Sequence, residues 1–275
     1  MREGLMGGAL LLLAGCGLAK AERIELSGRS EQRAVQVSAF DKVQLKGPDR
    51  VVVQVGGAQS VSLAGDSAVL DRLEVRVDDG ELVVRRKGRN WSVSGMRERA
   101  MITVTVPRLA AAAVGGSGEM SVDKVGGSNF AAAVGGSGEL RIGQAQAGKV
   151  KAAVGGSGDL RFDRIDADSV EMAIGGSGTI AAAGRTRMVE AAIGGSGDVE
   201  AGALAARTAE IAIAGSGNAA INASETAKIS IAGSGDVNVS GAINATDISI
   251  VKSQAGLNLP ALAEPVEEAE TKAAR

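Results

Sequence analysis

Seven serines, each flanked by glycine, occupy the most regularly spaced positions in this chain at which chemistry could occur. They are Ser117, Ser137, Ser157, Ser177, Ser196, Ser216 and Ser234. A serine hydroxyl becomes a nucleophile when a neighbouring base accepts its proton, and histidine is the usual base. The sequence contains no histidine, and seven equivalent copies are typical of a repeated structural element. We therefore predict no catalytic serine.

An acidic or polar residue follows each of these Gly-Ser-Gly motifs and could contribute to calcium binding. The series is Glu119, Glu139, Asp159, Thr179, Asp198, Asn218 and Asp236. In the calcium-binding nonapeptide repeat the acid lies one residue further on, and the period is nine rather than about 20. Thr179 and Asn218 also interrupt the run of acids. We favour solvated charges that discourage lateral aggregation, and we predict no metal site and no cofactor.

Acid pairs in the third repeat offer the chemistry of polysaccharide cleavage. Asp163 with Asp166, or Asp159 with Arg161, could act as the acid and base of a hydrolase or lyase. Sugar-binding clefts usually add aromatic rings, whereas this chain has three Phe, one Trp and no Tyr. We predict that the protein is not an enzyme, and keep a polysaccharide lyase or hydrolase as the alternative.

A basic segment surrounds the single tryptophan. Arg85, Arg86, Lys87, Arg89 and Trp91 lie close together between two apolar stretches. Such a loop could contact phosphate-bearing lipid heads or acidic polysaccharide. The alternative, which we favour, is a solvated hairpin loop whose arginines pair with nearby acids. The segment remains the best local candidate for a contact surface.

The spacing of the serines identifies the element that must carry all these residues. Successive serines are separated by 20, 20, 20, 19, 20 and 18 residues. A nearly constant period of this size is the signature of a solenoid, in which each repeat forms one coil stacked on the previous one.

Apolar residues within each repeat alternate with small or charged ones. Val114 precedes the first motif, and Met120 and Val122 follow it at the same parity. A period of two describes strands with one buried face. Equivalent strands should pair in parallel about 4.8 Å apart, and the glycines should supply positive φ at each corner. The chain is therefore predicted to be an all-β protein, a parallel β-helix with about 20 residues per coil.

The rest of the chain divides around this array. Residues 22–108 keep the alternation, as in Leu73–Val77, and are predicted to form irregular coils and a cap. A separate small β-domain is the alternative. Residues 109–251 form the regular coils, and residues 252–275 are expected to be a flexible tail rich in Ala and Glu.

Residues 1–21 have the features of an export signal. A short apolar stretch, Leu5–Ala14, ends in a Leu-Ala-Gly-Cys string at Cys16 that resembles a bacterial lipobox. Cleavage after Ala21 by ordinary signal peptidase is the competing reading. We favour lipidation of Cys16, which predicts an exported protein anchored to the membrane by its N-terminal lipid, on the periplasmic or the cell-surface side of the outer membrane.

Composition narrows the partners. A net charge of −2 gives no basis for nucleic-acid binding. Small residues recur at equivalent outward positions, Ala113, Ala133, Ala153 and Ala173, which could let a second copy pack there as a homo-oligomer.

Three stretches together resemble a known family. They are the stretch from Phe40–Val43 through Leu73–Val75, the stretch Ile102–Pro107, and the serial Gly-Ser-Gly units followed by an acid and Leu or Val. This pattern is similar to the head GIN domain family of auto-transporter adhesins, a family of unknown function. The resemblance implies a right-handed β-helix, export in bacteria and an adhesin-like role, with no catalytic or binding residues to transfer.

These observations converge on a non-catalytic exported module. We expect it to bind or scaffold, with a cell-surface glycan or another envelope component as partner. A periplasmic structural or envelope-stress component is a further alternative.

Overall fold

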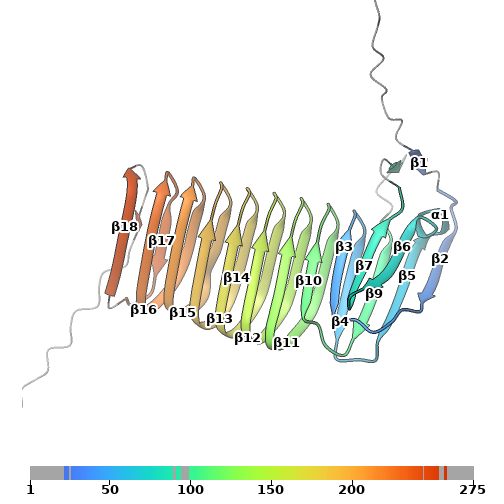
Figure 1. Ribbon diagram of the computed structural model, residues 1–275, viewed down its shortest axis with the longest axis horizontal. Helices are drawn as coiled ribbons and strands as arrows, with labels where there is room; N and C mark the ends of the chain where they lie inside the picture. The colour runs from blue at the N-terminus through green and yellow to red at the C-terminus, as the bar shows by residue number, and fades with distance from the viewer. Residues whose placement is uncertain are drawn as a thin grey trace, which may run out of the picture.

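The computed structural model describes residues 22–24, 26–88, 91–93, 99–243, 245–253 and 257–258. The body of the protein is a parallel β-solenoid of about seven turns that lie roughly 20 residues apart. Figure 1 shows the strands stacked side by side along the long axis, with a cap of shorter strands and one helical turn at the N-terminal end. The predicted fold class is therefore confirmed.

Long strands that follow the chain round each coil make up the regular part. They are β10 (Ala111–Val114), β11 (Glu119–Val134), β12 (Glu139–Val154), β13 (Asp159–Ile174), β14 (Thr179–Ile193), β15 (Asp198–Gly215) and β16 (Asn218–Gly233). Each strand pairs in parallel with the next, and equivalent residues align, so that Val134 lies beside Val154 and Val154 beside Ile174. The repeat therefore stacks in register, as its period predicts.

The core is a narrow column of aliphatic side chains between the walls of the solenoid. One continuous cluster of buried residues extends from Phe40 to Ile243. Phe130 and Phe162 are fully buried within it, and apart from Phe40 the other members are Val, Ile, Leu, Met and Ala. Small aliphatic side chains suffice because the two walls lie close together.

Close backbone approach explains the glycines of the motif. A Cβ added at Gly116 would lie 2.8 Å from the carbonyl oxygen of Gly47 in the adjacent coil, and one at Gly118 would lie 2.5 Å from that of Asp49. The equivalent glycines of later coils meet the preceding glycine carbonyl in the same way. The expectation of positive φ is wrong for this motif, where among its described glycines only Gly233 has φ in that range.

The first glycine of each motif is under no such constraint. A Cβ at Gly155 or Gly175 would meet nothing within 4 Å. The sequence agrees, because the sixth and seventh motifs carry Ala214 and Ala232 at this position while the second and last glycines never change. Two of the three glycines are therefore needed to let adjacent coils stack.

The N-terminal strands extend the solenoid but do not follow chain order. Strands β3 (Lys42–Lys46) and β4 (Arg50–Val55) pair in parallel with β10 and β11. Strands β7 (Glu81–Arg86) and β9 (Met101–Val106) pair in parallel with the other edges of β3 and β4. A coil formed later in the chain thus lies outside one formed earlier.

Antiparallel strands close this end of the solenoid. They are β2 (Ser30–Val35), β5 (Ser60–Asp66) and β6 (Leu73–Asp78), with the helical turn α1 (Ser67–Leu70) between the last two. Strand β5 pairs with β9 and β2, and β6 pairs with β7, all in antiparallel fashion. The change of direction ends the repeat of parallel pairing at the N-terminal end.

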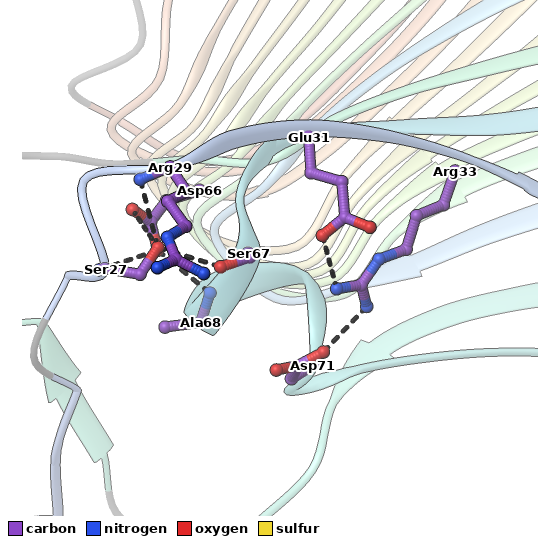
Figure 2. A network of polar contacts seen from close by, with 8 residues as sticks. All are labelled: Ser27, Arg29, Glu31, Arg33, Asp66, Ser67, Ala68 and Asp71. Carbon is purple, nitrogen blue, oxygen red and sulfur yellow. Dashed lines mark hydrogen bonds and ion pairs between the residues drawn. The ribbon is translucent and has the colours of Figure 1, made fainter.

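Asp66 fixes the helical turn to the chain that enters the cap (Figure 2). Its carboxylate accepts hydrogen bonds from the Ser27 hydroxyl at 2.9 Å and the Ala68 backbone N–H at 2.9 Å. It also accepts one from the Gly28 backbone N–H at 2.8 Å. Burial raises the pKa of Asp66, but these hydrogen bonds outweigh it and leave the pKa below its ordinary value of 3.8. Asp66 is thus the N-cap of α1.

The remaining described strands are short. They are β17 (Val237–Ser240), β18 (Ala245–Ser253) and β19 (Leu257–Asn258) at the C-terminal end, and β1 (Glu22–Ile24), which pairs in parallel with β8 (Trp91–Val93). A search of the described residues finds no helix with the length and apolar character needed to cross a bilayer.

Candidate functional site

An open groove of about 690 Å³ crosses strands β11 to β16 on one flank of the solenoid. Its central column consists of Gln146, Asp166, Arg185, Ala205 and Asn222, which are aligned neighbours in successive strands. Strands in the sheet are about 4.8 Å apart, so the groove runs along the solenoid axis. We call this feature the axial groove.

Two shortened coils, those that contain β14 and β16, contribute to the groove lining. The coil between Ser177 and Ser196 spans 19 residues and the coil between Ser216 and Ser234 spans 18, against 20 elsewhere. The pairing register shifts where these coils meet their neighbours, as between Ala181 and Ala183. Gly184, with φ of +123°, lies against the backbone of Ile165, where a Cβ would not fit. The shortened coil thus approaches the preceding coil closely at Gly184.

Three guanidinium groups and two carboxylates face one another along the groove. Arg185 donates to both oxygens of Asp166, through Nε at 3.1 Å and Nη2 at 2.5 Å. Arg187 Nη2 lies 2.9 Å from Asp168 Oδ1, two residues further along the same two strands. The third cation, Arg207, is held loosely, since its Nε lies 3.9 Å from Glu225 Oε1.

Asp166 is held in its ionised form. The hydrogen bond from Arg185 lowers the pKa of Asp166, and the same contact raises the pKa of Arg185. A general acid for glycoside cleavage needs the opposite, a carboxyl group whose pKa is raised. Asp166 is therefore suited to accepting hydrogen bonds rather than to giving up a proton.

Uncharged polar groups complete the lining. The amides of Gln146 and Asn222 stand toward its two ends, and the Ser224 hydroxyl donates to the backbone carbonyl of Ala206 at 3.2 Å. Gly127 and Gly148 line the groove at its β11 and β12 end. Within the described residues that line the groove there is no aromatic ring. The arrangement offers hydrogen bonds and charge along a line.

The acid pairs proposed for cleavage are not brought together in this groove. Asp163 accepts from Arg141 Nε at 2.8 Å and from Arg161 Nε at 3.2 Å, outside the groove lining. Asp166 pairs instead with Arg185. Asp159 lies beside Glu139 and Thr179 in the column after the corner. Each candidate acid thus has surroundings of its own.

The seven motif serines form an exposed column along the solenoid. From Ser137 onward, the backbone N–H of each motif serine donates to a glycine carbonyl of the preceding coil, as from Ser137 to Gly116 at 3.0 Å and from Ser157 to Gly136 at 2.9 Å. These bonds continue the inter-coil ladder through the corner. The motif therefore has a structural role.

The acidic column after the corner is stabilised by hydrogen bonds along it and by arginine at one end. Arg50 and Arg99 both bind Glu119, and the hydrogen bond from Arg50 is the main reason why the pKa of Glu119 lies below its ordinary value. Asn218 Nδ2 donates to Asp198 at 2.8 Å, and the Asp236 N–H donates to Asn218 at 3.1 Å. Over the described ranges, no group of three or more His, Cys, Asp or Glu side chains could hold a metal ion.

Arg85 and Lys87 of the basic segment contact residues of the N-terminal cap. Arg85 pairs with Glu74 at 2.7 Å, and Lys87 Nζ lies 3.4 Å from the backbone oxygen of Asp71. Arg86 is buried and binds Asp49. It must be removed from the predicted contact surface, because it lies on the inward face of β7.

The other predicted positions are placed as follows. Cys16 and Arg89 lie outside the described residues, and for Trp91 only the strand it belongs to, β8, is described. The column of Ala113, Ala133 and Ala153 is outward-facing and aligned from coil to coil.

Sequence reasoning missed the groove cations Arg185, Arg187 and Arg207. Their charges look like ordinary surface charges in the sequence. The available signal was the pair of short intervals between serines, since a coil of reduced length must alter one wall of the solenoid.

A family model described as "Putative auto-transporter adhesin, head GIN domain" matches residues 39–242. No curated protein matches the chain. Two solved structures from Parabacteroides distasonis are similar in fold. One, described as a putative lipid binding protein, has a TM-score of 0.77 and 24% identity, with 86% of this chain and 99% of that chain covered.

The second structure from that organism, described as a putative adhesin, has a TM-score of 0.80 and 20% identity, with 86% and 100% coverage of the two chains. A putative adhesin from Parabacteroides merdae has a TM-score of 0.75 and 18% identity, with 86% and 99% coverage. At these identities the likeness concerns the fold.

Proposed function

The chain belongs to the head GIN domain family of auto-transporter adhesins, and we propose that it is a non-catalytic, exported binding module that holds an extended ligand in its axial groove. The family and its solved relatives are described as adhesins or as lipid-binding proteins. Those descriptions support a binding role and leave the ligand open.

The observation that carries the proposal is the axial groove itself. It crosses six successive strands, and its charged groups pair with one another along the axis. A groove shaped in this way fits a chain-like ligand better than a compact one. The rigid, hydrogen-bonded ladder beneath it keeps the groove preformed, which lowers the entropy cost of binding.

The chemistry of the groove favours binding over turnover. Asp166 has a pKa below its ordinary value, and the sequence offers no histidine as a base. The groove-lining groups can therefore hold hydroxyl and carboxylate groups without a proton-transfer partner tuned for neutral pH.

Export and anchoring form the second part of the proposal. The apolar stretch Leu5–Ala14 and the string that ends at Cys16 favour lipidation at Cys16. An anchor there would tether the module through its N-terminal end and leave the groove along the length of the solenoid accessible. Export agrees with membership of an adhesin family.

A binding and turnover assay tests the groove. The purified full chain is incubated with isolated cell envelopes and with a panel of immobilised polysaccharides, and the bound protein and the ligand chain length are measured. Ala205 is exposed in the groove and Ala203 is exposed outside its lining, both on β15. Ala205→Leu narrows the groove and Ala203→Leu is its matched control.

We expect binding that Ala205→Leu reduces and Ala203→Leu leaves unchanged, with ligand recovered at full length. If the Ala205→Leu variant binds as tightly as the parent, the groove is not the binding site. If the ligand is recovered as shorter chains, the protein cleaves it and the proposal of a non-catalytic module is wrong.

A further inference from the structure

We propose that the axial groove binds an extended oligosaccharide carrying carboxylate groups, an oligouronate, laid parallel to the solenoid axis. This inference rests on the proposed function and names the ligand class for the same site. It follows from the length of the groove, its two exposed and loosely held guanidinium groups and its lack of a free strand edge.

The axial groove is long enough to hold several sugar units. The lining comes from six successive strands, β11 to β16, and strand spacing of about 4.8 Å makes the groove roughly 24 Å long. A single sugar ring would occupy a small part of it, whereas a short oligosaccharide would contact several coils at once. The repeated spacing of the wall also suits a ligand that itself repeats.

The axial groove is lined by charged side chains. Arg185, Arg187 and Arg207 line the groove against the two carboxylates Asp166 and Asp168. Arg185 is committed to Asp166 by two hydrogen bonds, but Arg187 makes one contact and Arg207 lies 3.9 Å from its acid. Both of the less committed groups are exposed, at 67% and 66%. The guanidinium groups of Arg187 and Arg207 are therefore accessible to a carboxylate group of a ligand.

Guanidinium is the appropriate group for that task. Its planar fork binds a carboxylate through two parallel hydrogen bonds, and such charge-assisted bonds are about twice as strong as neutral ones. Arg187 is on β14 and Arg207 on β15, so the two face successive units of a ligand that follows the axis. A neutral glycan would leave both without this gain.

The axial groove also offers groups that can hydrogen-bond the hydroxyl groups of a sugar. The Gln146 and Asn222 amides stand on either side of the charged centre, and the Asp166 oxygens retain further lone pairs beside Arg185. Amide and carboxylate groups of this kind hydrogen-bond sugar hydroxyls. Among the described lining residues there is no aromatic ring on which a sugar could stack. Binding therefore depends on many polar contacts to linked sugar units, and affinity should rise steeply with the number of units bound.

A peptide ligand is less well served. The described strands in the middle of the groove, β12 to β15, are each paired on both sides, so they offer no edge for an added strand. A chain that runs along the axis also crosses the strands at a right angle. An amphipathic helix would need an apolar trough, whereas charged and amide groups line this one.

The test measures binding of hexagalacturonate to the full chain by titration calorimetry, beside maltohexaose of the same length and galacturonate monomer. Vesicles of phosphatidylglycerol and an acidic peptide form two further arms. The double variant Arg187→Gln/Arg207→Gln removes the two exposed guanidinium groups. Arg141→Gln/Arg161→Gln is the matched control, because it also removes two exposed cations, both of which pair with Asp163 outside the groove.

We expect hexagalacturonate to bind at least roughly tenfold more tightly than maltohexaose, and the double variant to lose about that factor. The control should keep full affinity. Asp168→Asn should tighten binding several-fold, because it frees Arg187 from its acid. Added salt should weaken the interaction, since exposed charges are screened.

Equal affinity for the neutral and the charged hexamer would overturn the inference, as would a double variant that binds like the control. Preference for vesicles or for the acidic peptide over hexagalacturonate would overturn it in favour of that ligand class. If Ala205→Leu still blocks binding in those cases, only the ligand class is wrong. If Ala205→Leu has no effect, the proposed function itself fails.

Discussion

Arg86 and Asp49 form an ion pair inside the N-terminal end of the solenoid, with Arg86 Nε donating to Asp49 Oδ2 at 2.8 Å. The two side chains are 2% and 1% exposed. Asp49 also accepts the backbone N–H of Ala100 at 2.9 Å. One carboxylate thus joins the turn between β3 and β4 to the end of β7 and to the segment that leads into β9, which holds two coils together where the repeat has ended.

Removing that carboxylate should destabilise the protein strongly. Asp49→Ala removes the carboxylate to which Arg86 donates two hydrogen bonds, and breaking a buried ion pair costs about 3–5 kcal/mol of unfolding free energy. Urea denaturation followed by circular dichroism measures it. Asp41→Ala is the control, because Asp41 pairs with the largely exposed Arg108 at 3.1 Å, and exposed pairs contribute at most about 1 kcal/mol. Equal losses in the two variants would contradict a role for the buried pair.

Two neighbouring glycines should respond very differently to alanine. In Gly156→Ala the new methyl group would collide with the carbonyl of Gly136, whereas in Gly155→Ala it would meet nothing within 4 Å. We expect Gly156→Ala to lower the unfolding free energy by about 2 kcal/mol or more, and Gly155→Ala to stay within about 0.5 kcal/mol of the parent. Thermal melting of both variants decides. Similar effects would mean that coil stacking does not depend on this close approach.

Stability should fall in acid partly through Asp66. Its pKa is lower in the folded protein than the ordinary 3.8, so its contribution is complete above that value and is lost as pH falls through the lower, folded value. Melting temperatures measured from pH 6 down to pH 2 should therefore drop less steeply for Asp66→Asn than for the parent. Parallel curves would show that Asp66 has no share in the acid sensitivity.

The sequence was sufficient to predict the solenoid, because its period and the alternation within each repeat give both coil length and inward face. It could not predict that β7 and β9 lie outside β3 and β4, since that order depends on long-range pairing between unlike strands. The burial of Arg86 left a signal, because it continues the inward series of Leu82 and Val84.

The axial groove could be predicted only in part. The short intervals that end at Ser196 and Ser234 mark the coils that must differ. How one coil absorbs the loss of one residue and the other the loss of two is a matter of three-dimensional packing. The glycines illustrate a similar limit. Positive φ and close backbone approach both select glycine, and only Ala214 and Ala232 distinguish the tolerant position from the strict ones.

Anchoring makes a separate prediction. If Cys16 is lipidated, mass spectrometry of the mature protein should find an N-terminal peptide that begins with Cys16 and carries acyl chains, and Cys16→Ser should release the protein from the membrane fraction. A mature protein that begins at Glu22 would instead show cleavage after Ala21 and no lipid anchor.

The most direct test of a ligand-binding groove is a crystal structure of the full chain with hexagalacturonate. The account predicts sugar density along the column of Gln146, Asp166, Arg185, Ala205 and Asn222, with carboxylates against Arg187 and Arg207. Ordered sugar on the serine column or beside Arg85, with the axial groove holding only solvent, would contradict it.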